Sequence, residues 1–94
     1  MKLRLNGNSL RLRLSQADVA RLADRGRVEE TVEFAGLPLI YSIESVGTSA
    51  LAATFESNCI RVTIPAADAS RWIASDQTGI ENRNTSPRIL VEKD

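Results

Sequence analysis

Apolar and cationic residues alternate along the first fourteen positions of the chain. Two stretches, KLRL and LRLRL, flank Asn6-Gly7-Asn8, so leucines alternate with residues that are mostly Lys or Arg. A period of two is typical of strands with one buried face, and Asn-Gly readily adopts the positive φ of a tight turn. We therefore predict a β-hairpin over residues 2–14, with its leucines inward and its cations outward.

The period changes directly after this hairpin. Ser15 is a suitable N-cap, and Asp18 follows at the acidic position of a capping box. Gly26 is placed to end a helix in the left-handed conformation. The apolar stripe between these signals consists of Val19, Leu22 and Ala23. We predict a helix over residues 16–25.

Two strands complete the first half. Apolar and polar residues alternate over residues 28–34, although Glu30 then falls on the apolar side, which a bulge or an edge position would relieve. Gly36-Leu37-Pro38 is expected to turn the chain, and a strand rich in Ile and Tyr follows over 39–45.

The second half repeats this order. We predict a strand over residues 50–55, a turn at Ser57-Asn58 and an alternating strand over 60–64. Pro65 opens a helix whose apolar stripe includes Trp72, and Gly79 marks its exit. Short strands over 80–82 and 89–92 end the chain.

The two halves align without a gap over fourteen positions. A shift of fifty residues superimposes residues 10–23 on 60–73 and matches Arg11 with Arg61 and Asp18 with Asp68. The sequence thus predicts one α+β domain over residues 1–94, with an internal duplication of 1–47 and 48–94. Each half is ββαββ, giving about eight short, mostly antiparallel strands and two helices related by a pseudo-two-fold axis. A half of this size could hardly bury its own core, so we expect the halves to share one sheet or barrel.

Composition excludes several classes of protein. Hydrophobic residues make up 43% of the chain and charged residues 26%, which is ordinary for a globular domain and argues against disorder. The net charge is zero, so no overall field attracts nucleic acid or an anionic membrane. No apolar run is long enough for a secretory signal or a membrane helix, and we expect a cytoplasmic protein.

Little chemistry is available to the side chains. The chain has no His and one Cys, Cys59, which rules out imidazole-based nucleophile pairs and single-chain zinc or iron–sulfur sites. The acids Asp18 and Asp68 lie in first helical turns, where they complement the helix dipole and pair with Arg21 and Arg71. We expect no enzyme activity, catalytic residue, metal or cofactor.

Lys2, Arg4, Arg11 and Arg13 share the outward face of the predicted hairpin. One interpretation is a cationic strand pair that contacts phosphates or an acidic protein surface. Three observations weigh against nucleic acid: the zero net charge, an aromatic content of 4%, and no aromatic residue between the cations. The other interpretation pairs these cations across strands with Glu29 and Glu33. Both remain open.

Trp72 is the only tryptophan and occupies the position that Leu22 holds in the first helix. It either packs in the core or anchors an interface. Arg4, Arg11, Arg13 and Trp72 are therefore the candidate interaction residues.

Four segments of the chain form a distinctive combination: MKLRLNGNSLRLRLSQADV, GRVEE, WIASDQTGIE and RILVEKD. On these segments the chain resembles, nearly end to end, an uncharacterised family of short bacterial proteins known only as a domain of unknown function. This resemblance implies no catalytic residues. It also implies that members continue beyond a Glu-Lys-Asp ending into an acidic, Cys-containing tail.

These observations lead to two functional hypotheses. The first is a non-catalytic interaction module that forms a homodimer or binds an unidentified protein. The second is a small-ligand or anion-binding domain that uses the helix-start amides near Ser15 or the turn over residues 76–79.

Overall fold

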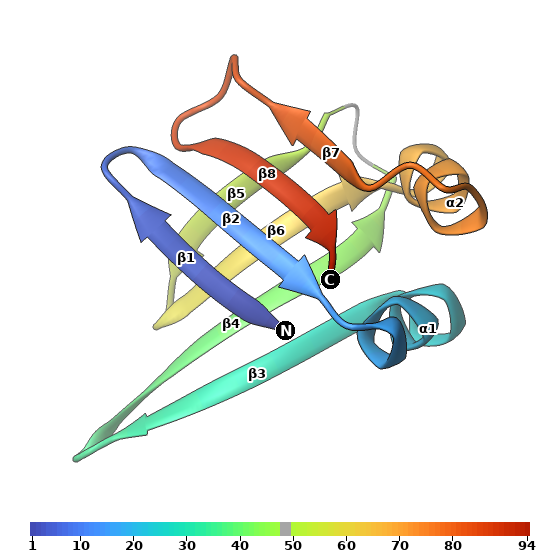
Figure 1. Ribbon diagram of the computed structural model, residues 1–94. Helices are drawn as coiled ribbons and strands as arrows, with labels where there is room; N and C mark the ends of the chain where they lie inside the picture. Colours follow the sequence, from blue (N-terminus) through green and yellow to red (C-terminus); the bar gives the residue numbers. More distant parts are fainter. Residues whose placement is uncertain (48–49) are drawn as a thin grey trace.

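A computed structural model describes residues 1–47 and 50–94 of the chain (Figure 1). Its first half contains a helix with one hairpin before it and one after it: β1 (Lys2–Asn6), β2 (Ser9–Leu14), α1 (Gln16–Arg25), β3 (Arg27–Phe34) and β4 (Leu37–Val46). Its second half has the same order: β5 (Ala52–Glu56), β6 (Cys59–Pro65), α2 (Ala66–Ala74), β7 (Gly79–Asn82) and β8 (Arg88–Lys93). The predicted ββαββ halves are confirmed. Their predicted boundary, between residues 47 and 48, lies at the edge of the described residues, because residue 48 is not among them.

The eight strands form two open, four-stranded mixed sheets rather than one sheet or barrel. Sheet A has the order β1-β2-β8-β7, and sheet B has the order β3-β4-β6-β5. Each half therefore contributes one hairpin to each sheet. The hairpins of the two halves join through the parallel pairs β2–β8 and β4–β6, while the remaining pairs are antiparallel.

The strand registers follow the pseudo-two-fold relation of the halves. Leu10 of β2 pairs with Ile89 of β8, and Ile60, which lies fifty residues after Leu10, pairs with Tyr41 of β4. The last strands of the halves are thus related by a shift of 48 residues (89 − 41).

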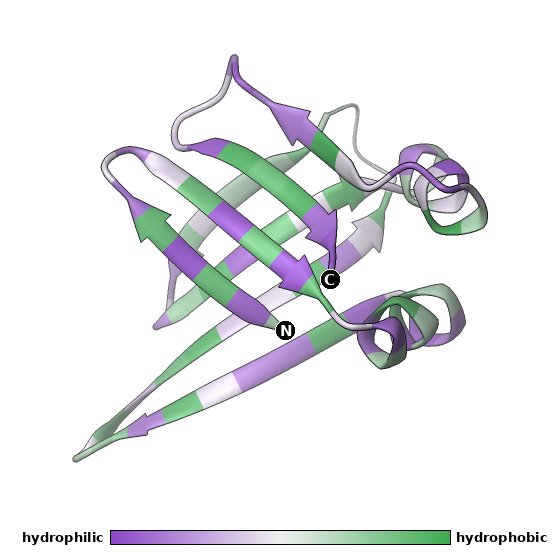
Figure 2. Cartoon of the chain, in the orientation of Figure 1, coloured by the Kyte–Doolittle hydropathy of each residue, from purple (hydrophilic) through white to green (hydrophobic). Residues whose placement is uncertain are grey.

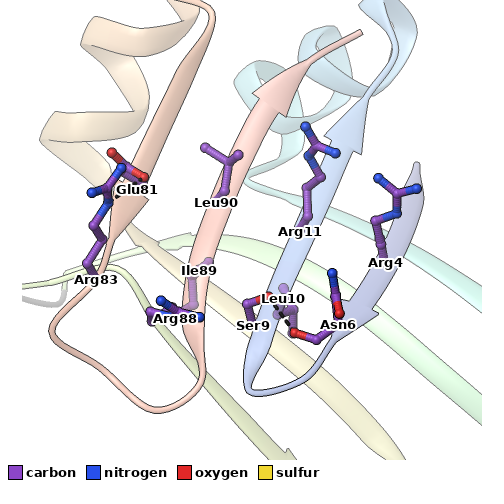
Figure 3. Close-up of a pocket in the computed structure, with 10 residues that line it drawn as sticks. All are labelled: Arg4, Asn6, Ser9, Leu10, Arg11, Glu81, Arg83, Arg88, Ile89 and Leu90. Carbon is purple, nitrogen blue, oxygen red and sulfur yellow. Dashed lines mark hydrogen bonds and ion pairs between the residues drawn. The ribbon is translucent and has the colours of Figure 1, made fainter.

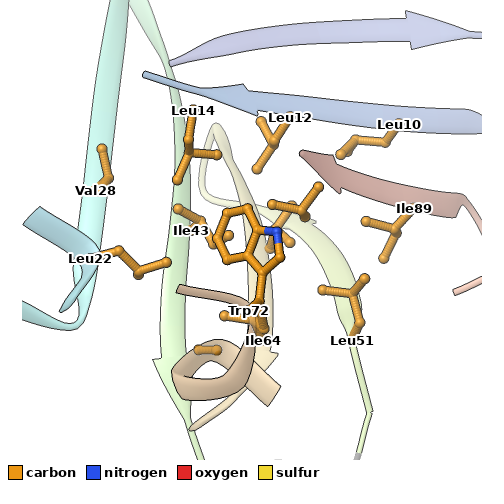
Figure 4. Close-up of a cluster of buried hydrophobic side chains, with 13 residues drawn as sticks. Leu10, Leu12, Leu14, Leu22, Val28, Ile43, Leu51, Ile64, Trp72 and Ile89 are labelled. Carbon is orange, nitrogen blue, oxygen red and sulfur yellow. The ribbon is translucent and has the colours of Figure 1, made fainter. Parts of the chain in front are cut away.

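The core lies between the sheets, and both helices close the same end of the sandwich (Figures 1 and 4). Hydrophobic and hydrophilic bands alternate along the first hairpin, as Figure 2 shows for β1 and β2. The inward residues are those of the predicted alternation. The buried apolar residues are Leu10, Leu12, Leu14, Leu22, Val28, Ile43, Leu51, Val62, Ile64, Ala69, Trp72, Ile89 and Val91.

Local signals set the bounds of α1. The hydroxyl of Ser15 accepts a hydrogen bond from the backbone N–H of Asp18, and the Asp18 carboxylate accepts one from the N–H of Ser15. Gly26 ends the helix at φ 72° and donates its N–H to the carbonyl of Leu22. The capping box and the left-handed C-cap are both as predicted.

Two local predictions need correction. The turn between β3 and β4 contains only Ala35 and Gly36, with Gly36 at φ 85°, whereas Leu37 and Pro38 already belong to β4. Pro38 is tolerated there because β4 pairs with β6 only from Ile40 onward, so its missing N–H interrupts no ladder. The strand predicted over 50–55 is β5, which begins at Ala52.

Neither helix of the described residues is long and apolar enough to cross a membrane.

Candidate interaction surface

Four cations project from the outer surface of the β1–β2 hairpin, as the alternation predicts. Lys2 lies opposite Arg13, and Arg4 lies opposite Arg11, so like charges face each other across both pairs. Such pairs are unfavourable unless an anion lies between or beside them. The question is therefore which carboxylates neutralise this surface.

The predicted partners, Glu29 and Glu33, are wrong. Both residues belong to β3, which lies in sheet B. The acid beside these cations is Glu92 of β8, whose Oε1 lies 2.8 Å from Arg11 Nε and 3.1 Å from Arg13 Nη2. Arg13 also has Asp94 at 3.9 Å, but no ion pair links Lys2 or Arg4 to an acid within the described residues.

The pair between Arg11 and Glu92 has a counterpart on sheet B. There Arg61 Nε lies 3.5 Å from Glu44 Oε2, at the positions related to Arg11 and Glu92 by the repeat. In both pairs the Nε is buried and close to the carboxylate, but its N–H is not aligned for a hydrogen bond. An Arg–Glu pair across the parallel strands is thus a shared structural feature of the two sheets.

Two further arginines join this surface. Arg83 follows β7, Arg88 begins β8, and both line a depression of about 490 Å³ together with Arg4 and Arg11 (Figure 3). A second hollow of about 300 Å³ adjoins it between β1 and β2. We call the outer surface formed by Lys2, Arg4, Arg11, Arg13, Arg83 and Arg88 the arginine face.

Positive charge exceeds negative charge on the larger depression. Its lining contains four arginines and one acid, Glu81, which is itself paired with Arg83 at 3.3 Å. Leu90 contributes an apolar floor between Arg11 and the β7 edge, whereas Asn6 and Ser9 supply polar groups. The depression can therefore accept carboxylate or phosphate oxygens beside an apolar group.

Trp72 is not part of this surface. Its side chain is fully buried between the sheets, with the indole N–H donating to the carbonyl of Thr78 at 3.3 Å (Figure 4). Lys93 Nζ lies 5.5 Å from the centre of its ring. Of the two interpretations for Trp72, the structure shows core packing, and the residue has no exposed area through which to anchor a partner.

The start of α1 is already occupied by groups of the chain itself. The carboxylate of Asp18 is buried, and it contacts the Met1 ammonium at 2.8 Å and Arg21 Nη1 at 2.8 Å. Glu30 also binds this ammonium, at 3.3 Å. An external anion at Ser15 would therefore compete with Asp18. The second predicted position for an anion is the turn over residues 76–79, and this turn contains no arginine.

This cluster shifts three pKa values. Burial opposes ionisation of Asp18, but the ammonium of Met1 and the hydrogen bonds from Ser15 outweigh it and lower the pKa of the carboxyl. Burial likewise disfavours the Met1 ammonium, yet Asp18 and Glu30 raise its pKa. Burial and the same two acids raise the pKa of Tyr41, whose hydroxyl donates to the Met1 carbonyl.

Glu30 on the apolar side of β3 is explained by this cluster, because the ammonium of Met1 lies beside it. Asp18 and Glu30, the two acids that converge on this ammonium, are therefore both engaged in ion pairs. Among the described residues, no group of three His, Cys, Asp or Glu side chains is placed to hold a metal ion.

A family model matches residues 1–94, the whole length of the chain. The chain belongs to the family of unknown function DUF7009. This agrees with the resemblance seen in the sequence. Neither a curated protein nor a solved structure matches this DUF7009 member.

Proposed function

We propose that this protein is a non-catalytic interaction module of the cytoplasm, and that its arginine face binds an acidic segment of a partner protein. The observation that carries this proposal is the excess of arginines around the 490 Å³ depression, where Arg4 and Arg88 have no ion-pair partner among the described residues. Arginine is suited to this task because its planar group binds carboxylates in bidentate geometry.

The internal repeat supports a role for these cations beyond folding. The outward positions of sheet B that correspond to Lys2, Arg4, Arg13 and Arg88 carry Ala52, Thr54, Thr63 and Ile40. Sheet B forms the same ladder without these charges, whereas it retains the pair equivalent to Arg11 and Glu92. We therefore assign Arg11 mainly to structure. The four cations without a counterpart on sheet B are assigned to binding: Lys2, Arg4, Arg13 and Arg88.

An acidic protein segment suits this surface better than a nucleic acid. Unpaired bases are held largely by stacking on aromatic side chains. No aromatic residue of the described part of the chain lines either hollow of the arginine face. The apolar floor at Leu90 instead favours a segment in which an apolar side chain lies among carboxylates.

The depression also favours a second candidate, a site for a small anion. Its volume of about 490 Å³ is within the range of ligand pockets, and Arg4, Arg83 and Arg88 approach it from three different segments. A phosphate or carboxylate metabolite would use the same arginine chemistry, so the experiment must separate the two sources.

Fluorescence anisotropy of a labelled peptide rich in glutamate and leucine tests the proposal on the full chain. We expect binding that weakens steeply with salt, and a loss of about tenfold or more in affinity for the double variant Arg4→Gln/Arg88→Gln. Neither arginine has an ion pair within the described part of the chain, so the variant should fold normally.

The matched control is Arg25→Gln/Arg71→Gln, which removes the same charge from exposed helix positions at the other end of the molecule. Peptide binding by this control should equal that of the wild type. Equal weakening in both double variants, or no binding by the wild type, contradicts the proposal. Binding of inorganic phosphate by a chain that does not bind the peptide supports the small-anion site instead.

A further inference from the structure

Large apolar side chains remain exposed at the end of the sandwich opposite the helices. The exposed fractions are 61% for Leu5, 40% for Val32, 59% for Phe34, 56% for Leu37 and 70% for Phe55. We call these five residues the apolar end.

All five belong to the inner faces of the sheets, the faces that elsewhere form the core. Val32 and Phe34 share the side of β3 that carries the buried Val28, and Leu37 lies opposite Phe34 on β4. Leu5 and Phe55 hold equivalent positions in the repeat, opposite Leu10 and Ile60. The core surface thus continues past the point where the opposite sheet ends.

The apolar end has a projecting part and a receiving part. The projecting part is the arm, residues 31–39, because β4 before Ile40 pairs only with β3 and the hairpin extends beyond the other strands (Figure 1). The receiving part is a hollow of about 550 Å³ beside it. Its lining includes Leu5, Leu39, Phe55, Ile60 and Pro87, and none of the described residues that line it is charged.

The area of this patch fits one particular kind of occupant. With roughly 150–250 Å² for a large apolar side chain, the five exposed fractions amount to about 500 Å². The largest apolar patch on a typical monomer measures about 300–600 Å², and this patch lies in the upper part of that range. Two such patches in contact would bury about 1,000 Å² of apolar surface, as expected for a standard interface of about 1,600 Å² that is some 60% apolar.

A second copy of this chain meets these requirements on both sides. A two-fold interface uses the same patch on both partners, and this patch contains both an apolar projection and an apolar hollow. The zero net charge of the chain also leaves no overall repulsion between two copies. We propose that the apolar end is the interface of a two-fold homodimer in which the arm of each copy covers the hollow of the other. The arginine face, on the outside of sheet A, stays open in this dimer.

Light scattering of the purified chain during size-exclusion chromatography tests this proposal over a wide range of concentrations. The expected mass is twice the chain mass of 10.3 kDa. Phe34→Asp and Phe55→Asp should each raise the dimer dissociation constant about thirtyfold or more, because a carboxylate would be buried in an uncharged contact. Ala20→Asp adds the same charge to an exposed position of α1 and should leave the dimer unchanged.

Hydrogen exchange of the wild type provides a readout that does not depend on how the variants fold. Amides of residues 31–39 should lose protection on dilution, while those of α1 and α2 should not. A chain that stays at 10.3 kDa at every concentration overturns the proposal, even if another protein binds the patch. A dimer that survives both aspartate substitutions overturns it as well, because its interface then lies elsewhere.

Discussion

At the scale of single residues, the carboxylate of Asp18 makes three polar contacts, which join the start of α1 to the N-terminus. It accepts the N–H of Ser15 at the start of α1, pairs with Arg21 one turn later, and holds the ammonium of Met1. Its side chain is 4% exposed. Burial of one charged group is therefore compensated by the burial of another. Removal of Asp18 leaves the buried ammonium with only the partly exposed Glu30 as its ion-pair partner.

We predict that Asp18→Asn lowers the free energy of unfolding by about 2–4 kcal/mol near neutral pH. The pKa of Asp18 is lowered in the folded state, so its contribution is present above the unfolded pKa of about 3.9 and lost as the pH falls through the folded value. The raised pKa of the Met1 ammonium acts in the opposite sense, with stability lost as the pH rises through it. Urea unfolding followed by Trp72 fluorescence over a pH series measures both effects.

Asp68→Asn is the matched control, at the position that the repeat relates to Asp18. Asp68 pairs with Arg71 in the same way, but its side chain is 33% exposed and its partner is 75% exposed. Its loss should cost less than about 0.5 kcal/mol. Equal losses in the two variants would show that the buried cluster contributes no more than a surface ion pair.

Residue-level features were predictable where the partners are close in sequence. Ser15 and Asp18 form their capping box three residues apart, and the pattern that reveals it is local. Met1 and Glu30 meet across 29 residues, so alternation could only mark Glu30 as misplaced. The tertiary fold brings the Met1 ammonium to Glu30, and no local pattern specifies that contact.

At the scale of elements, α2 depends on a residue from the last strand. It has nine residues, its N-cap Pro65 makes no side-chain cap, and Ser75 at its C-cap is extended rather than left-handed. Lys93 of β8 compensates at the C-terminal end. Its Nζ donates to the carbonyls of Trp72 and Ser75, each at 2.7 Å, where a cation also complements the helix dipole.

We predict that Lys93→Met costs about 2 kcal/mol, because it removes two charged hydrogen bonds but keeps an unbranched apolar chain as far as Cε. The Trp72 emission spectrum should change as well, since the cation near its ring is lost. Thermal unfolding measures the cost against Lys2→Met, which removes an exposed lysine that forms no ion pair in the described structure. A cost no greater than that of Lys2→Met would refute a capping role for Lys93.

Most elements were predictable because their signals are local. Both helices and the hairpin turns follow caps, proline, glycine and periodicity within a few residues. The parallel pairings were not, because β2 and β8 lie 79 residues apart at Arg13 and Glu92 and no turn between them sets the register. That gap explains why Glu92 was missed as the partner of Arg11 and Arg13, and why Arg83 and Arg88 were not placed on the arginine face.

At the scale of the molecule, the two halves are interlocked rather than adjacent. Sheet A joins β2 of the first half to β8 of the second, and sheet B joins β4 to β6. The core follows the same rule, since Leu12 and Val91 lie on one sheet and Ile43 and Val62 on the other. If one half unfolded, both sheets would lose half of their strands and the remaining hairpins would face water.

This arrangement predicts that the chain unfolds in one step despite its repeat. The transition seen by Trp72 fluorescence, which reports on the second half, should coincide with that seen by circular dichroism of both sheets. The free energy of unfolding should fall by about 1 kcal/mol per molar urea, as for a domain of this size. Native-state hydrogen exchange extends the test to single strands, because amides of β2 and β4 should open with the same free energy as those of β6 and β8. Halves that fold independently would instead separate these values, with both strands of one half opening before either strand of the other.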